Sequence, residues 1–233
     1  MIPFRDNIPS RSFPIITILI ILVNVSAFLY ELALGRYLEP FLFHYGVVPA
    51  AVVAWPESDV PISAVGLPFL TSMFLHAGWL HLIGNMWYLW IFGDNVEDRL
   101  GHFTYLLFYL LCGLGAGIVH TILNYNTTVP SIGASGAIAG VLGAYVVSYP
   151  WARVQTLVPI FIFIQIIEIP ALIVLGFWFV MQFLYGAASL ATTTANAGGV
   201  AWWAHIGGFV VGMILIGLFP RKDRPQYEYH WRS

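Results

Sequence analysis

Long apolar segments recur along this chain of 233 residues, and they restrict its fold more than any other feature of the sequence. A helix that spans a bilayer needs about 20 predominantly apolar residues. Hydrophobic residues make up 59% of the chain and charged residues only 9%, and the mean hydropathy is +0.82. A soluble domain carries about 25% charged residues. The sequence therefore predicts an all-α, polytopic membrane protein.

Six segments are candidates for spanning helices. They cover residues 13–34, 78–93, 103–123, 135–149, 171–190 and 201–219. The first segment is longer than a signal-peptide core and lacks a clear cleavage site, so we expect it to be retained. The sequence contains no internal repeat. We therefore interpret residues 1–233 as a single membrane domain with a six-transmembrane-helix bundle.

The start of the fifth segment is not obvious, because the apolar run from Thr156 is too long for one span and too short for two. Proline is favoured in the first turn of a helix, so we expect the fifth helix to begin near Pro170. This leaves Thr156–Ile167 as a connector at the membrane surface. The long loop before the second helix, residues 35–70, is expected to form its own interfacial structure.

The basic residues set the expected orientation. With both termini inside, eight of the nine Lys and Arg residues fall on inner segments, and only Arg36 falls outside. Short cytoplasmic segments of membrane proteins carry an excess of Lys and Arg. We therefore expect a multi-pass protein of the cell (inner) membrane with cytoplasmic N- and C-termini.

Net charge and cysteine content argue against several other classes of protein. The formal net charge is −2, and no basic cluster is large enough to suggest a nucleic-acid partner. Cys112 is the only cysteine, so no internal disulfide can form, and a metal site would have to rely on histidines and carboxylates. We expect neither a metal nor a cofactor.

Four polar side chains are expected at a similar depth in the bundle. Ser135 begins the fourth segment, and His205 lies about one turn into the sixth. His81 and Asn85 lie four residues apart in the second segment, a spacing that puts both on one helix face. The second, fourth and sixth helices cross the membrane in the same direction. All four side chains are therefore expected near the outer leaflet.

The fourth segment is too short to cross the whole hydrocarbon core. A helix over Ser135–Tyr149 is roughly 22 Å long at 1.5 Å per residue, whereas the core is about 30 Å thick. If its inner end reaches the inner surface, Ser135 lies below the outer surface and the preceding loop dips in. A submerged helix start presents unpaired N–H groups, which could hold a developing oxyanion.

Three motifs on these segments resemble those of the rhomboid intramembrane serine proteases. "GASGAIAG", Gly133–Gly140, resembles the G-x-S-G nucleophile motif of the family. "HAGWLHLIGN", His76–Asn85, resembles its second-helix pattern of two histidines and an asparagine, and "AHIGGFVVG", Ala204–Gly212, resembles its sixth-helix A-H-x-x-G motif. The six-span layout is similar to the bacterial-type core, so the resemblance covers nearly the whole chain.

The resemblance implies a serine endopeptidase that cleaves transmembrane segments of membrane proteins near the outer leaflet. Carried over by position, Ser135 is the nucleophile and His205 the general base. The oxyanion hole is formed by His81, Asn85 and the backbone N–H of Ser135. A serine hydroxyl is a weak nucleophile until a base takes its proton, which agrees with these roles. The expected partners are membrane-protein substrates with a transmembrane helix and the lipid bilayer.

Supporting roles are expected for His76, Gly133, Gly136 and Gly208. His76 is expected to organise the first loop by hydrogen bonds. Gly133 and Gly136 would let the loop dip and the substrate backbone approach, and Gly208 would allow the sixth helix to pack closely against the fourth.

The chain departs from the family pattern at two places. Many members have Trp-Arg in the first loop, where this chain has Leu67-Pro68. Many also have an aromatic residue four positions after the serine, which packs on the base histidine. This chain has Ala139 there, so His205 must be oriented in some other way.

Other interpretations remain open at this level. Ser135 alone could be a packing residue, because small residues at four-residue spacing are common at helix contacts in membranes. A transporter or channel would use the same polar residues as a path for protons or a substrate, although its binding site would usually lie near the midplane of the bilayer. A non-catalytic relative would only bind membrane proteins.

The sequence also suggests where a gate and a modification site would lie. The fifth helix and the loop Ala191–Val200 are candidates for a moving gate. His120 and His44 are expected to have no role. Asn126 begins a glycosylation pattern that matters only in a secretory-pathway host.

Overall fold

The computed structural model describes residues 2–160, 163–191 and 201–219. Each of the six predicted segments contains a helix. The predicted ends lie within two residues of the observed ones, except for the end of the second helix. The helices are α1 (Ile15–Ala33), α5 (Trp79–Leu100), α6 (His102–Leu123), α7 (Ser135–Ser148), α8 (Ala171–Ala191) and α9 (Trp202–Leu218). The chain is thus a mostly helical, multi-pass membrane protein.

The helices differ in whether they could cross a membrane alone. Within the described ranges, α1, α6 and α8 are long and apolar enough to do so, whereas α7 and α9 have only 14 and 17 residues. Helix α5 and the preceding segment Ser63–Phe74 are long and apolar enough only when taken together, and the chain bends by 78° between them.

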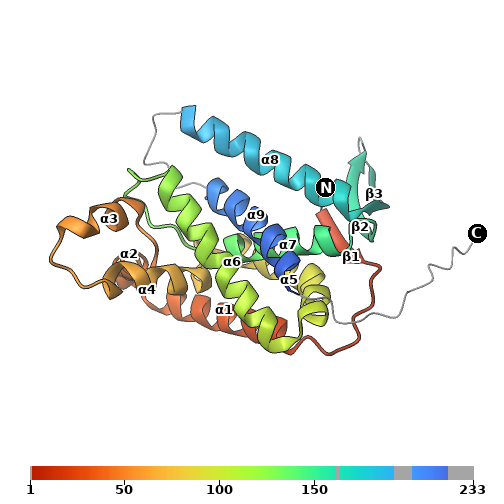
Figure 1. Cartoon of the computed structure of the whole chain (residues 1–233), viewed down its shortest axis with the longest axis horizontal. Coiled ribbons are helices and arrows are strands. Elements are labelled where there is room, and N and C mark those ends of the chain that lie inside the picture. The colour runs from red at the N-terminus through yellow and green to blue at the C-terminus, as the bar shows by residue number, and fades with distance from the viewer. Residues whose placement is uncertain (1, 161–162, 192–200, 220–233) are drawn as a thin grey trace, which may run out of the picture.

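The long first loop folds into short helices rather than an extended chain. They are α2 (Leu38–Tyr45), α3 (Pro49–Ala54) and α4 (Ser63–Thr71). Figure 1 shows these three helices together at one end of the bundle, with the strands at the opposite end. We call these the loop end and the sheet end.

A three-stranded antiparallel sheet was not expected from the sequence. It consists of β1 (Ile2–Asp6), β2 (Arg153–Ile160) and β3 (Phe163–Pro170), in the order β1-β2-β3. Within the described residues, the segment Thr156–Ile167, which was predicted to be a connector at the membrane surface, thus consists of parts of β2 and β3. Strand β2 pairs with β1 on one side and with β3 on the other, and these ladders give backbone N–H and C=O groups of this apolar segment hydrogen-bond partners. The fifth helix begins at Ala171, as the argument from Pro170 predicted.

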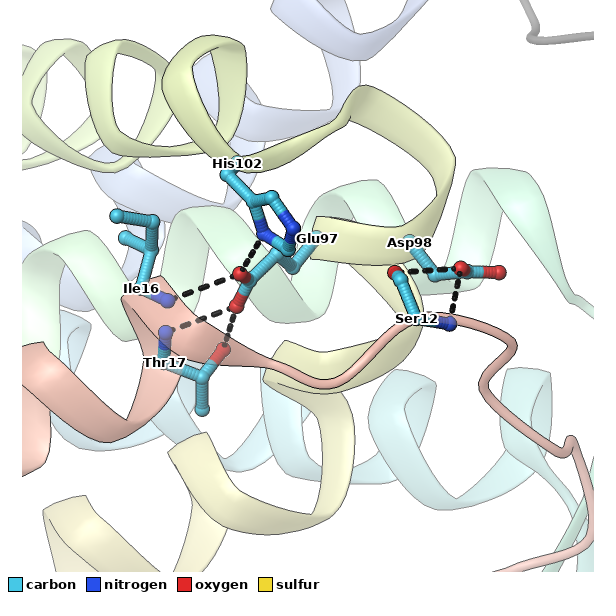
Figure 2. A network of polar contacts seen from close by, with 6 residues as sticks. All are labelled: Ser12, Ile16, Thr17, Glu97, Asp98 and His102. Atoms are coloured by element: carbon cyan, nitrogen blue, oxygen red, sulfur yellow. Dashed lines mark hydrogen bonds and ion pairs between the residues drawn. The ribbon is translucent and has the colours of Figure 1, made fainter.

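The second helix continues seven residues beyond its predicted end at residue 93, because its charged last turns have partners. The buried carboxylate of Glu97 accepts hydrogen bonds from the backbone N–H groups of Ile16 and Thr17, at 2.9 and 2.8 Å, and from the Thr17 hydroxyl at 2.7 Å. The His102 ring donates to the same carboxylate (Figure 2). A negative charge at the first turn of α1 satisfies N–H groups that have no partner within that helix.

Helix α7 lies at the centre of the bundle, and residues 136–146 of it are all buried. Its contact with α9 is made by glycines. A Cβ atom added to Gly208 would overlap the carbonyl oxygen of Gly136, and one added to Gly212 would overlap that of Gly140. The close packing expected of Gly208 is therefore present. Because the two helices touch through their backbones, residues at the starts of α7 and α9 are brought close together.

Candidate active site

Ser135 and His205 meet where α7 and α9 begin. Ser135 is the first residue of α7, and His205 is the fourth residue of α9. The Nε2 atom of His205 lies 2.7 Å from the Oγ atom of Ser135, which is hydrogen-bonding distance. Residues 70 positions apart in the sequence thus form the serine–histidine pair that the motifs predicted.

The other ring nitrogen of His205 contacts a residue that the sequence analysis did not single out. Nδ1 of His205 lies 2.7 Å from Oε1 of Gln182 on α8, and both side chains are buried, each 8% exposed. An amide oxygen can only accept a hydrogen bond, so Nδ1 carries the proton. Nε2 is then unprotonated in the neutral ring and accepts from the Ser135 hydroxyl.

A tryptophan from the same helix packs against the His205 ring. The ring centroids of Trp178 and His205 are 5.8 Å apart, with the planes inclined by 33°. Trp202 approaches the imidazole edge-on, at 6.3 Å. These aromatic contacts come from α8 and from α9 itself, so the small side chain of Ala139 on α7 does not leave the imidazole without an aromatic neighbour.

One signal in the sequence could have pointed to Gln182. It is the only amide or charged side chain in the apolar segment 171–190. A polar side chain with strong hydrogen-bonding groups inside a membrane span is costly and usually functional. Trp178 lies four residues earlier, on the same helix face.

His81 presents a hydrogen-bond donor to the region around Ser135. Its Nδ1 atom accepts a long hydrogen bond from the backbone N–H of Ala77, at 3.4 Å, which leaves the proton on Nε2. A Cβ atom built on Gly133 would lie 2.7 Å from this Nε2 atom and 3.5 Å from Oγ of Ser135. Gly133 also has φ of +129°, a conformation that favours glycine. His81, Gly133 and Ser135 therefore surround one small space.

Asn85 forms a hydrogen bond with His76, the histidine that was expected to organise the first loop. Its Nδ2 atom lies 3.0 Å from Nε2 of His76, and the backbone N–H of His76 donates to the buried carboxylate of Glu31, at 3.2 Å. An amide nitrogen carries two protons, so Asn85 keeps one for another acceptor. His76 thus connects Asn85 to α1, whereas the sequence predicted that it would organise the first loop.

These side chains open onto one cavity of about 1230 Å³. Its lining includes Ser135, His205, His81, Asn85 and Trp178, and it extends to Arg36 and Glu39 at the loop end. His120, which was expected to have no role, also lines it. Across the described ranges, no three His, Cys, Asp or Glu side chains gather as they would around a metal ion. The predicted gate loop falls largely on residues 192–200, outside the described residues.

The arrangement has the components of acyl-transfer chemistry. A hydroxyl contacts a neutral nitrogen base whose tautomer is fixed, and His81 and Asn85 hold N–H donors nearby. As the first residue of α7, Ser135 also has a backbone N–H with no acceptor in its own helix. The fold and this site define a helical membrane protein with a serine–histidine pair at the edge of an internal cavity.

Comparison with known proteins identifies the family. The profile of the Rhomboid domain matches residues 66–222, and the chain belongs to the rhomboid family. Membership supports a function of the intramembrane-protease type.

Several relatives carry rhomboid names. The chain is similar to Rhomboid-like protein 11, chloroplastic, from Arabidopsis thaliana, with 33% identity over 68% of this chain and 55% of that protein. It is also similar to Presenilin-associated rhomboid-like protein A, mitochondrial, from Danio rerio, with 29% identity over 70% of this chain and 41% of that protein. The match thus spans about half of the length of these relatives.

Proposed function

We propose that the protein is an intramembrane serine endopeptidase that uses Ser135 and His205 as a catalytic dyad. The observation that carries this proposal is the 2.7 Å contact between Nε2 of His205 and Oγ of Ser135, in a ring whose Nδ1 atom is already bonded to Gln182. A base that already points its lone pair at the serine needs no rearrangement before it takes the proton. Its substrates are membrane proteins with a transmembrane helix.

In the proposed reaction, Oγ of Ser135 attacks the carbonyl carbon of the scissile peptide bond while its proton moves to Nε2 of His205. The carbonyl oxygen becomes an oxyanion, which accepts hydrogen bonds from His81 Nε2, Asn85 Nδ2 and the Ser135 backbone N–H. The C–N bond then breaks, and His205 returns the proton to the leaving amine nitrogen. Water, deprotonated by His205, hydrolyses the ester and releases the free serine.

The proposed location is the cell (inner) membrane, with both termini cytoplasmic. The distribution of Lys and Arg supports this orientation, because the described basic residues other than Arg36 lie in segments expected inside. In this orientation the cavity at the loop end faces the outer leaflet, and cleavage occurs there. The alternative location is an organelle membrane, because the relatives are named chloroplastic and mitochondrial.

Labelling with a fluorophosphonate probe tests the proposed dyad. The wild-type protein, purified in detergent, should be labelled at one serine, and Ser135→Ala and His205→Ala should not be labelled. A synthetic transmembrane peptide should be cleaved by the wild type alone. Labelling that persists in Ser135→Ala would contradict the proposal. A transporter would instead show solute flux in liposomes that survives Ser135→Ala.

A further inference from the structure

A third side chain, Gln182, forms a hydrogen bond with the histidine of the proposed dyad, and it is an amide rather than a carboxylate. Oε1 of Gln182 lies 2.7 Å from Nδ1 of His205, on the side of the ring opposite Ser135. Three groups from three different helices therefore form one hydrogen-bonded line. Gln182 belongs to α8, His205 to α9 and Ser135 to α7.

The tautomer of His205 depends on which end of the Gln182 amide faces it. With Oε1 toward the ring, Nδ1 keeps the proton and Nε2 can accept one from serine. With the NH₂ group toward the ring, Nδ1 would be the acceptor and Nε2 would carry the proton. In that second state the ring could not act as a base toward Ser135. The orientation of one buried amide thus decides whether the dyad is competent.

The orientation of the ring depends on the same face of α8. Trp178 lies one turn before Gln182, and its ring packs against the imidazole with centroids 5.8 Å apart. Residues four apart share a helix face, so both contacts come from one stripe of α8. The acidic side chain that completes a serine–histidine–aspartate triad has the same two tasks, orientation and tautomer selection, and additionally supplies a charge.

We infer that Gln182 is a positioning residue for His205, selecting the Nδ1-protonated tautomer and aligning Nε2 with Ser135. The inference rests on the proposed serine-protease function. Gln182 is not among the residues that line the cavity, so its loss should lower the reactivity of Ser135 and leave substrate binding intact. Because the amide is neutral, it aligns the base without the electrostatic stabilisation that a carboxylate would give to the imidazolium.

The test compares two replacements of Gln182 by the rate constant of fluorophosphonate labelling, measured from pH 5 to pH 9. Gln182→Met keeps the length of the side chain and removes the acceptor. Labelling should slow by roughly 10- to 100-fold, which is part of the 10²–10⁴-fold that a positioned base contributes. With a transmembrane peptide substrate, kcat should fall and KM should stay unchanged.

Gln182→Glu should restore the alignment and add a charge. Its labelling rate should stay near that of the wild type above neutral pH. The acidic limb of its pH profile should move to higher pH, because a carboxylate next to the ring favours the imidazolium, which cannot act as a base. The titratable side chains that already act on His205 through space are His81 and His120, and both are unchanged in these variants. A purely structural role of Gln182 would instead leave Gln182→Glu as slow as Gln182→Met above neutral pH.

The matched control is Leu184→Met, an exposed position on the same helix, which should label like the wild type. An unchanged rate in Gln182→Met, or a Gln182→Glu variant as slow as Gln182→Met above neutral pH, would overturn the inference. If Gln182→Met fails to fold, the labelling rate of Gln182→Glu above neutral pH, compared with that of the wild type, decides alone. Failure of the proposed function is distinct, because labelling of the wild type would then be absent or would survive Ser135→Ala.

Discussion

The backbone of Gly208 lies directly against the carbonyl group of Gly136, so α9 and α7 touch without any side chain between them. A second pair, Gly212 and Gly140, continues the contact further along the same helices. Small residues allow this approach in membranes, where van der Waals packing stabilises helix pairs. The contact fixes the distance between the helix starts that carry Ser135 and His205.

Replacing Gly208 by alanine should therefore push α9 away from α7. We expect a loss of about 1–3 kcal/mol, the usual range for overpacking a close contact. Thermal unfolding in detergent and fluorophosphonate labelling should both show the defect. Gly217→Ala is the control in the same helix, because a Cβ there meets nothing within 4 Å. A Gly208→Ala protein as stable and reactive as Gly217→Ala would contradict the packing argument.

Gly133→Ala should disable the site and leave the bundle folded. The new Cβ would lie 2.7 Å from Nε2 of His81, so this donor must move, and φ of +129° is unfavourable for alanine. The loss of an oxyanion donor lowers kcat by about 10²–10³-fold. Cleavage of a transmembrane peptide measures this loss. Gly66→Ala, where added atoms meet open space, should cleave normally.

Glu97→Gln should loosen the junction between α1 and α5. The glutamine NH₂ group would face N–H and O–H donors that now bond to the carboxylate, as Figure 2 shows. A lost hydrogen bond to a buried charged group costs about 1.5–3 kcal/mol, and each kcal/mol corresponds to about 2–4 °C in Tm for a chain of this size. The exposed Glu168→Gln variant should keep the wild-type Tm, and equal values for the two variants would refute the prediction.

Asp6 of β1 should make stability depend on pH. Burial raises the pKa of its carboxyl from 3.8 to about 7, and the hydrogen bond from Tyr145 offsets part of this shift. Between these two values the folded state binds more protons than the unfolded state, so the contribution of Asp6 to stability is lost as pH rises from 4 to 7.

The Asp6→Asn variant should therefore lose less Tm than the wild type between pH 5 and pH 8. The exposed Asp59→Asn variant should follow the wild type. If the Tm values of wild type and Asp6→Asn fall in parallel, Asp6 does not titrate in this range.

The helices and the contact between Ser135 and His205 could be predicted because both depend on local patterns. Apolar length defines the helices, and the motif around Ser135 lies at a helix start that the topology places level with His205. Gln182 could not be identified in this way, since its partner lies 23 positions away on another helix and no spacing connects the two. Strand β1 was missed for the same reason, because it pairs with a strand about 150 residues later. The pairing of β2 with β3 is local in sequence, but their continuous apolar run does not alternate in a way that separates a strand from a helix.

Spacing and alignment are separable in this site. The distance from Ser135 to His205 is set by two helices in backbone contact, whereas the alignment of the imidazole is set by α8. That helix exposes the apolar side chains of Val180, Phe183 and Leu184 on its other face. If α8 moved away, the distance between Ser135 and His205 would stay the same. Only the orientation of the imidazole ring, which lets Nε2 accept the serine proton, would be lost. The contact between Ser135 and His205 would then persist without the ring alignment that the proposed reaction needs, and the return of α8 would restore that alignment.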